Sequence, residues 1–158
     1  MACDAQALED PSGSAHEPRW AVLYDADCGF CKWLLSGLLR WDRAARLQPI
    51  ALQRPEADDL LSELSPVERR ASWHLISPTG ARCSGGAAVV PLLTLLPGGR
   101  LAAAVFARSP GLNDRGYRWV AERRSQLSRW IPANAKWRAG QRVQERERAV
   151  QVAGPRRG

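Results

Sequence analysis

The sequence has few of the features that mark membrane-spanning or secreted proteins. Its longest largely apolar stretch, residues 87–96, contains Pro91 and ends at Pro97, so it falls far short of the roughly 20 residues that span a bilayer. Residues 1–18 contain four acids and no lysine or arginine, and they lack the apolar centre of a signal peptide. We therefore expect residues 1–18 to be a disordered leader and the protein to be cytoplasmic, without a membrane span.

Cysteine and histidine, the usual ligands of zinc, are also scarce. The chain has only six of these residues: Cys3, Cys28, Cys31, Cys83, His16 and His74. Four cysteines in 158 residues do not suggest the disulfide framework of a small secreted domain. Structural zinc needs four ligands, usually in two paired sets, and only one Cys-x-x-Cys is present. A zinc site is thus an alternative in which Cys83, His74 and His16 are the remaining candidates, and no cofactor is implied.

Positive charge is in excess, with 23 lysines and arginines against 16 acids and a net charge of +7. Such a charge can indicate nucleic acid or an anionic membrane as a partner. The arginines are spread through the predicted helices, however, and no arginine-rich block alternates with exposed aromatic residues, so nucleic-acid binding is not favoured. The excess is largest in residues 133–158, where the hydrophobic periodicity fades. We expect this segment to be a solvated, partly helical basic tail outside the core.

Residues 20–41 organise the chain. Residues 21–24 are a short apolar run of the length expected for a buried strand, and the segment after Cys31 has the pattern of an amphipathic helix. Cys28-Gly29-Phe30-Cys31 lies between the two. A Cys-x-x-Cys at a strand-to-helix junction is typical of a thioredoxin-like redox site.

The helical register predicts that the two cysteines differ in exposure. Cys31 shares one helical face with four leucines, whereas charged residues and Ser36 lie on the other side. The two sets are Cys31, Leu34, Leu35, Leu38 and Leu39, and Lys32, Ser36, Arg40 and Arg43. Cys31 therefore begins the buried stripe, and Cys28 precedes it at the open end of the helix. This asymmetry suits dithiol exchange, in which Cys28 attacks a disulfide and Cys31 resolves the mixed disulfide.

The start of the helix also favours a thiolate over a thiol. Its first N–H groups have no partner within the helix and the helix dipole is positive there, which lowers the pKa of a cysteine. Lys32 acts in the same direction, whereas the carboxylates of Asp25 and Asp27 act against it. Asp25 has two interpretations: it transfers a proton to or from Cys31 during resolution, or it ends the strand and binds a loop amide.

The order of the elements predicts an α/β fold with a central mixed sheet of about four strands. Residues 46–52 are a second strand, at an edge because Pro49 cannot donate to a ladder. A helix begins at Pro55, and residues 72–77 and 81–84 form a hairpin. Helices are expected at residues 87–96, 101–107 and 117–130, the last capped by Asn113 or Asp114. A strand–helix–strand unit with a right-handed crossover followed by a hairpin gives a thioredoxin-like domain over residues 19–132, with extra helices at its end.

The chain resembles the DCC family of predicted thiol–disulfide oxidoreductases, named for an Asp-x-x-Cys-x-x-Cys motif. The motif is carried by Asp25, Cys28 and Cys31, and the resemblance extends over roughly residues 20–130. It continues through weaker pieces in the right order: Ser72-x-His74-Leu75, Gly80, Gly85-Gly86-Ala87-Ala88, Leu95-Leu96-Pro97-Gly98-Gly99 and Tyr117-Arg118-Trp119-Val120-Ala121. The resemblance implies a thioredoxin-like fold and a dithiol–disulfide activity toward protein or small-molecule thiols and disulfides, without naming a substrate.

The chain departs from thioredoxins in one respect. Thioredoxins carry a cis-proline just before the third strand, facing the cysteine pair, and here Glu68-Arg69-Arg70-Ala71-Ser72 contains no proline. We therefore expect a different substrate-docking surface. The alternative to an enzyme is a thioredoxin-like binding module without redox turnover, which the intact cysteine pair argues against. A monomer is expected.

Three further residues have two interpretations each. His74, in an alternating strand, is a structural histidine or an acid–base group. Cys83 is a small buried apolar residue or a third redox thiol. The seven tryptophans are scattered through the predicted elements, and most are expected to be buried or half-buried. Trp33, just after the cysteine pair, is expected to border a substrate groove.

Overall fold

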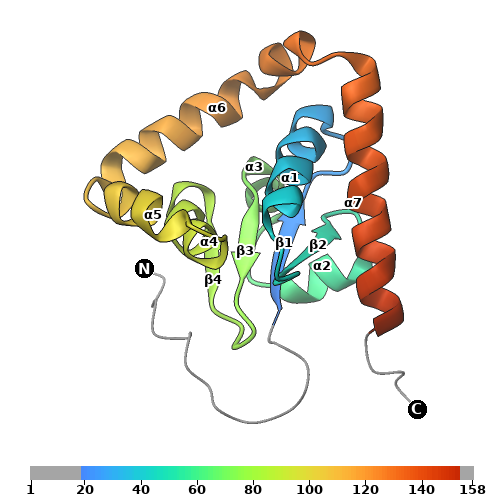
Figure 1. The fold of residues 1–158 in the computed structure, drawn as a ribbon, viewed down its shortest axis with the longest axis horizontal. Coiled ribbons are helices and arrows are strands. Elements are labelled where there is room, and N and C mark those ends of the chain that lie inside the picture. The colour runs from blue at the N-terminus through green and yellow to red at the C-terminus, as the bar shows by residue number, and fades with distance from the viewer. Residues whose placement is uncertain (1–18, 154–158) are drawn as a thin grey trace.

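A four-stranded mixed sheet flanked by helices makes up the computed structural model, which describes residues 19–153 (Figure 1). The strands are β1 (Trp20–Tyr24), β2 (Leu47–Ala51), β3 (His74–Ile76) and β4 (Arg82–Ser84), in the order β2-β1-β3-β4. β1 is parallel to β2 and antiparallel to β3, and β3 is antiparallel to β4. The predicted thioredoxin-like α/β class is confirmed, and Pro49 lies in an edge strand as expected.

Most helices follow the predicted order with shifted boundaries, but the helix at residues 66–71 was not predicted. They are α1 (Gly29–Trp41), α2 (Pro55–Leu60), α3 (Pro66–Ala71), the 3₁₀ turn η2 (Gly85–Ala88), α4 (Val89–Leu95), α5 (Gly99–Ala107), α6 (Pro110–Trp130) and α7 (Ala133–Ala153). The prediction that Asn113 or Asp114 caps the helix before Trp130 is wrong, because α6 begins at Pro110 with Ser109 at the cap position. Proline fits the first turn because the N–H that it lacks would have no partner there. None of these helices is both long enough and apolar enough to cross a membrane.

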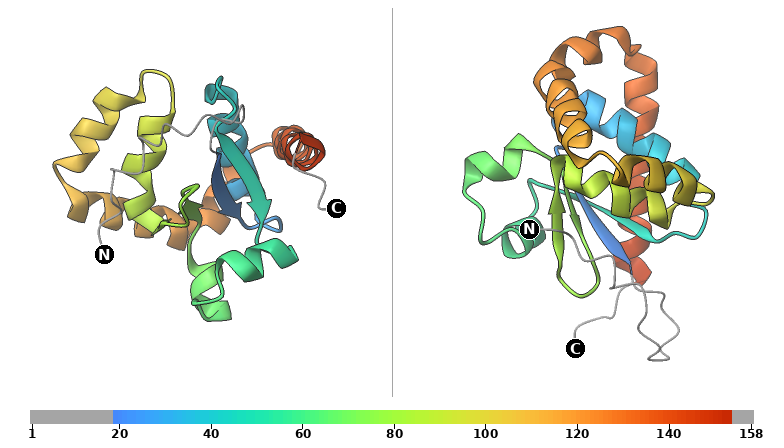
Figure 2. Two further views of the ribbon diagram at one scale, coloured as in Figure 1. Left: turned by 90° about the horizontal axis from the view of Figure 1, so that it is seen from below. Right: turned by 90° about the vertical axis from the view of Figure 1, so that its left-hand side faces the viewer.

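The side chains of β1 alternate between two apolar clusters, one on each face of the sheet. Val22 packs in the larger cluster with residues of α1, α4 and α7, including Leu35, Leu92 and Val143. Leu23, the next residue, belongs to a smaller cluster with Ala57 of α2 and others. Figure 2 shows α2 and α3 apart from the other helices, in agreement with the two clusters. The sheet is therefore covered on both faces, and its first strand is fully buried at Val22 and Leu23.

The register predicted for α1 is partly wrong. Leu35 and Leu39 are buried as expected, but Leu34 is 41% exposed and Ser36 is buried. Ser36 is buried because α7 packs along its side of α1, where Arg142 Nη1 donates to Ser36 Oγ at 2.7 Å. A polar residue on a helix is compatible with burial when another helix brings it a hydrogen-bond partner.

The prediction of a solvated basic tail outside the core is also wrong for its described part. Residues 133–153 form α7, which runs beside α1 and β2 along one side of the molecule (Figure 1). Ala139 and Val143 are buried, and so is Glu147, one turn further along the same face. The core therefore continues past Pro132, where we expected it to end.

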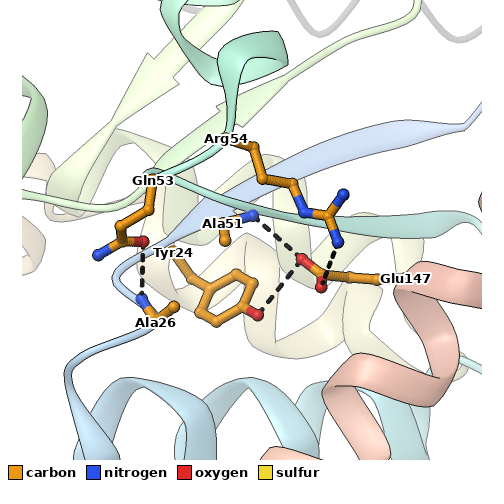
Figure 3. Close-up of polar contacts among 6 residues, drawn as sticks. All are labelled: Tyr24, Ala26, Ala51, Gln53, Arg54 and Glu147. Carbon is orange, nitrogen blue, oxygen red and sulfur yellow. Dashed lines mark hydrogen bonds and ion pairs between the residues drawn. The ribbon is translucent and has the colours of Figure 1, made fainter.

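Polar contacts bind α7 to the sheet and to the end of α1. The carboxylate of Glu147 accepts hydrogen bonds from the Tyr24 hydroxyl at 3.3 Å and the Ala51 N–H at 3.1 Å, and it pairs with Arg54 at 3.4 Å (Figure 3). One residue earlier in the helix, Arg146 pairs with Asp42 at 2.9 Å. Such contacts have no apolar periodicity, so the sequence pattern did not indicate them.

Candidate active site

Cys28 and Cys31 lie at the start of α1, directly after the loop that follows β1. Cys28 is the N-cap residue of the helix, with extended backbone angles, and its Sγ accepts a hydrogen bond from the Cys31 N–H at 3.2 Å. The two cysteines come within 2.6 Å of each other. Both are half-buried, so the predicted contrast between an exposed Cys28 and a shielded Cys31 is not seen in their exposure.

The two cysteines differ instead in the pKa values of their thiols. The hydrogen bond from the Cys31 thiol is the main cause that lowers the pKa of Cys28 to about 6, and the Cys31 N–H and the charge of Arg124 act in the same direction. Burial and the charge of Asp25 oppose them. The pKa of Cys31 is raised, first because its thiol donates to Cys28 and then by burial and the charge on Cys28. At neutral pH the pair is therefore a Cys28 thiolate beside a Cys31 thiol.

Alkylation of Cys28 in the reduced protein is expected to become faster with rising pH, with a midpoint at about pH 6. Cys31→Ala removes the thiol donor but keeps the backbone N–H, so the midpoint is expected to rise by about one to two pH units. A hydrogen bond to a charged group contributes about 1.5–3 kcal/mol, and one pKa unit corresponds to about 1.4 kcal/mol. The measurement is iodoacetamide labelling over a pH series, read on the Cys28 peptide by mass spectrometry.

A matched control for this experiment is Arg40→Gln, which removes an exposed charge at the far end of the same helix. It should leave the midpoint in place. A midpoint that also stays in place in Cys31→Ala would show that the Cys31 thiol does not stabilise the Cys28 thiolate.

Asp25 follows β1 and holds the loop before Cys28. Its Oδ1 accepts hydrogen bonds from the Asp27 N–H at 3.0 Å and from Gln53 Nε2 at 2.9 Å. Gln53 in turn accepts from the Ala26 N–H at 3.2 Å, so it joins the loop to the end of β2 (Figure 3). These contacts agree with the interpretation of Asp25 as a residue that binds a loop amide, and they leave its proposed role in proton transfer untested.

A cavity of about 300 Å³ lies beside Cys31, between α1 and α6. Most of its lining is apolar, with Asp25, Arg70 and Arg124 as the charged residues. Phe30 and Leu34 line the cavity on the side of α1, whereas the predicted Trp33 does not. Trp33 is 44% exposed and contacts Phe30, with the two ring centroids 6.3 Å apart. The expectation that most tryptophans are buried or half-buried is wrong as well, because Trp41, Trp119, Trp130 and Trp137 are also exposed.

Tyr117 and Arg124 of α6 belong to this site, and sequence reasoning missed both. The Tyr117 hydroxyl accepts a hydrogen bond from the Trp73 N–H at 2.9 Å, and the two rings stack with centroids 6.5 Å apart. Burial raises the pKa of Tyr117. Tyr117 thus covers the segment before β3, where the sequence lacks the proline of thioredoxins. The only signal was the position of Tyr117 in the last piece of the family resemblance.

His74 is buried in the sheet, as its structural interpretation predicted. Cys83 is buried as well, but it is disulfide-bonded, so neither of its two interpretations as a free cysteine is confirmed. The ring nitrogens of His74 contact Ser84 Oγ at 2.7 Å and the Arg69 carbonyl at 3.0 Å, and burial lowers the pKa of the ring. Cys83 is 2% exposed and belongs to the larger apolar cluster. Within residues 19–153, no three His, Cys, Asp or Glu side chains gather as a metal site would require. Cys3 and His16 lie outside the described residues.

Comparison with known proteins agrees with this geometry. The family model of the DCC1-like thiol-disulfide oxidoreductases matches residues 22–130, which include the cysteine pair, the sheet and α6. Because the match covers more than half of the chain, the protein belongs to this family. No curated protein and no solved structure matches the chain.

Proposed function

We propose that the protein is a thiol–disulfide oxidoreductase that cycles between a Cys28–Cys31 dithiol and the corresponding disulfide. The observation that carries this proposal is the lowered pKa of Cys28, to about 6, beside a Cys31 with a raised pKa. The thiolate is the nucleophile in disulfide exchange, and a thiol whose pKa lies near the ambient pH combines a large thiolate fraction with good nucleophilicity.

In the first step, the Cys28 thiolate attacks one sulfur of a substrate disulfide. A Cys28–substrate bond forms, the substrate S–S bond breaks, and the released thiolate takes up a proton. In the second step, the Cys31 thiolate attacks Cys28 Sγ, the Cys28–Cys31 disulfide forms, and the second substrate thiolate leaves. Two electrons pass from the protein to the substrate, and the reverse sequence oxidises a dithiol.

The contacts between the cysteines support the order of these steps. In the reduced protein, the hydrogen bond to Cys28 and the charge on Cys28 raise the pKa of Cys31. Once Cys28 is bonded to substrate it carries no charge, so both effects weaken and Cys31 loses its proton more readily. We propose Asp25 as the acceptor of that proton, because it lines the same cavity as Cys31. The monomeric state and cytoplasmic location expected from the sequence stay predictions.

Equilibration of the purified protein with a series of dithiothreitol or glutathione redox buffers tests the proposal. We expect a two-electron transition between the dithiol and the Cys28–Cys31 disulfide. Its midpoint should lie between about −270 and −120 mV, because thioredoxin and DsbA, with cysteine pKa values of about 7 and 3.5, have those potentials. Failure to form the intramolecular disulfide under any buffer would instead favour a binding module without redox turnover.

A further inference from the structure

We infer that the cavity beside Cys31 binds a small, largely apolar thiol or disulfide that carries an anionic group, rather than a segment of polypeptide. This inference rests on the proposed function and adds a substrate class to it. It depends on three observations: the shape of the cavity, the pairing of the backbone around it, and its charge.

The cavity has the size and lining of a small-molecule site. Its volume of about 300 Å³ is at the lower end of the range for such sites, and its walls are mainly apolar. α1 contributes Phe30 and Leu34, and the helices α5 and α6 contribute Phe106 and Val120. Cys31 lies in the wall, and Cys28 approaches it to within 2.6 Å, so a ligand in the cavity is placed beside the dithiol.

The backbone of Trp73, which lines the cavity, is not free to pair with an extended peptide. Peptides that add to a sheet edge need free N–H and C=O groups there. At Trp73, just before β3, the N–H donates to the Tyr117 hydroxyl at 2.9 Å, and the C=O accepts from the Gly85 N–H at 3.1 Å. Both backbone groups of Trp73 are therefore occupied by the protein itself.

α6 is packed too closely to move aside without cost. A Cβ atom on Gly86 would lie 2.8 Å from the backbone N of Asp114, which is shorter than any ordinary contact. The ring of Tyr117 likewise lies 3.3 Å from a Cβ built on Gly85, a residue with φ of +60°. The two glycines thus let α6 lie directly on η2, and Tyr117 closes the place where a peptide would dock.

The charge of the lining favours an anion. Arg70 and Arg124 stand against a single carboxylate, that of Asp25, and neither arginine forms an ion pair with a described residue. The Asp25 carboxylate already accepts hydrogen bonds from the Asp27 N–H and from Gln53 Nε2. An anionic group on the ligand would therefore find an arginine without a competing partner, and Arg124 is close enough to the cysteines to lower both of their pKa values.

Matched dithiols test the inference on the full-length oxidised protein. Dihydrolipoate has an aliphatic chain that ends in a carboxylate, dihydrolipoamide is its neutral analogue, and a short dicysteine peptide represents polypeptide substrates. Each rate of reduction of the Cys28–Cys31 disulfide is divided by the rate at which the same dithiol reduces hydroxyethyl disulfide. We expect dihydrolipoate to exceed dihydrolipoamide by about tenfold, the effect of one charge-assisted hydrogen bond, and both to exceed the peptide.

Arg124→Gln should reduce the ratio of the two lipoyl rates about tenfold, while Arg124→Lys should retain most of it. The ratio is the proper readout because Arg124 also affects the reactivity of the cysteines, and that effect is the same for both dithiols.

Filling the cavity gives an independent test. Gly116 lines the cavity, and a Cβ there would meet no atom within 4 Å, so Gly116→Leu is expected to fold and to occupy the space of the ligand. It should lower both lipoyl rates at least about tenfold relative to reduction by dithiothreitol. Gly111→Leu is the matched control, since it lies on the same helix, has equally open space around its Cβ position, and does not line the cavity.

The outcomes separate this inference from the proposed function. Equal normalised rates for the two lipoyl dithiols, or a fastest rate for the peptide, would overturn the inference and leave the oxidoreductase intact. Failure of every dithiol, dithiothreitol included, to reduce a Cys28–Cys31 disulfide would overturn both.

Discussion

Replacement of Cys28 by serine is expected to lower disulfide exchange by about 10³-fold or more, as the loss of a catalytic nucleophile does in other enzymes. A serine hydroxyl supplies no thiolate at neutral pH, and Cys31 does not take over the role, because burial still raises its pKa when the Cys28 thiolate is gone. Cys31→Ser should behave differently, because Cys28 still attacks and no second thiol resolves the product. That variant should accumulate a mixed disulfide with the substrate on Cys28.

The measurement is the rate of reduction of a small disulfide together with mass spectrometry of the trapped species under non-reducing conditions. Far-UV circular dichroism of both variants shows whether the fold is retained. Both residues are half-buried at a helix start, and the exchange of sulfur for oxygen is small, so we expect little change in the spectrum. A mixed disulfide on Cys31 in Cys28→Ser would reverse the assignment of the two roles.

Replacement of Glu147 by alanine is expected to lower the free energy of unfolding by about 3 kcal/mol or more. It leaves the Tyr24 hydroxyl and the Ala51 N–H without their acceptor in a buried place, and it removes the partner of Arg54 (Figure 3). Each unsatisfied buried group costs about 1–3 kcal/mol, and the loss of the partner of Arg54 adds less, because that side chain is 35% exposed. Against a typical total of about 5–15 kcal/mol, this is a large loss.

Urea denaturation of the variant against the native protein measures the effect. Glu145→Ala is the matched control, because it removes an exposed carboxylate from the same helix and should change stability by less than about 0.5 kcal/mol. The stability of Glu147→Gln should fall between those of Glu147→Ala and Glu145→Ala, since the amide oxygen still accepts one hydrogen bond. Equal effects at the two positions would mean that the contacts of Glu147 contribute little to stability.

The features that the sequence predicted correctly are those encoded over short distances. The apolar run of β1, the Cys-x-x-Cys after it and the leucines of α1 lie within one stretch of chain. Their periodicity and spacing therefore predicted the strand, the helix and the position of the cysteine pair at the start of the helix. The edge position of β2 followed from the backbone chemistry of Pro49 alone. The order of these elements then predicted the thioredoxin-like fold.

The features that the sequence did not predict depend on partners far along the chain. The buried residues of the described part of α7 are Ala139, Val143 and Glu147. Because two of them are small or charged, they give only a weak apolar pattern in the sequence. Ser36 is buried only because Arg142 reaches it from 106 positions away. The contrast between the pKa values of Cys28 and Cys31 comes mainly from the hydrogen bond between their side chains, which lowers one and raises the other, and no pattern of residue types predicts such geometry.

The contacts of α7 also have a consequence for synthesis of the protein. Arg142 lies 106 positions after Ser36, and Arg146 lies 104 positions after Asp42, so α1 is synthesised long before its neighbour. At translation rates of about 5–20 residues per second, the delay is roughly 5–20 s. During that interval the nascent chain carries the dithiol on a helix whose inner side is uncovered, and contacts that close so long a loop form late. Ser36 and Asp42 of this region therefore gain their arginine partners only after α7 has been synthesised.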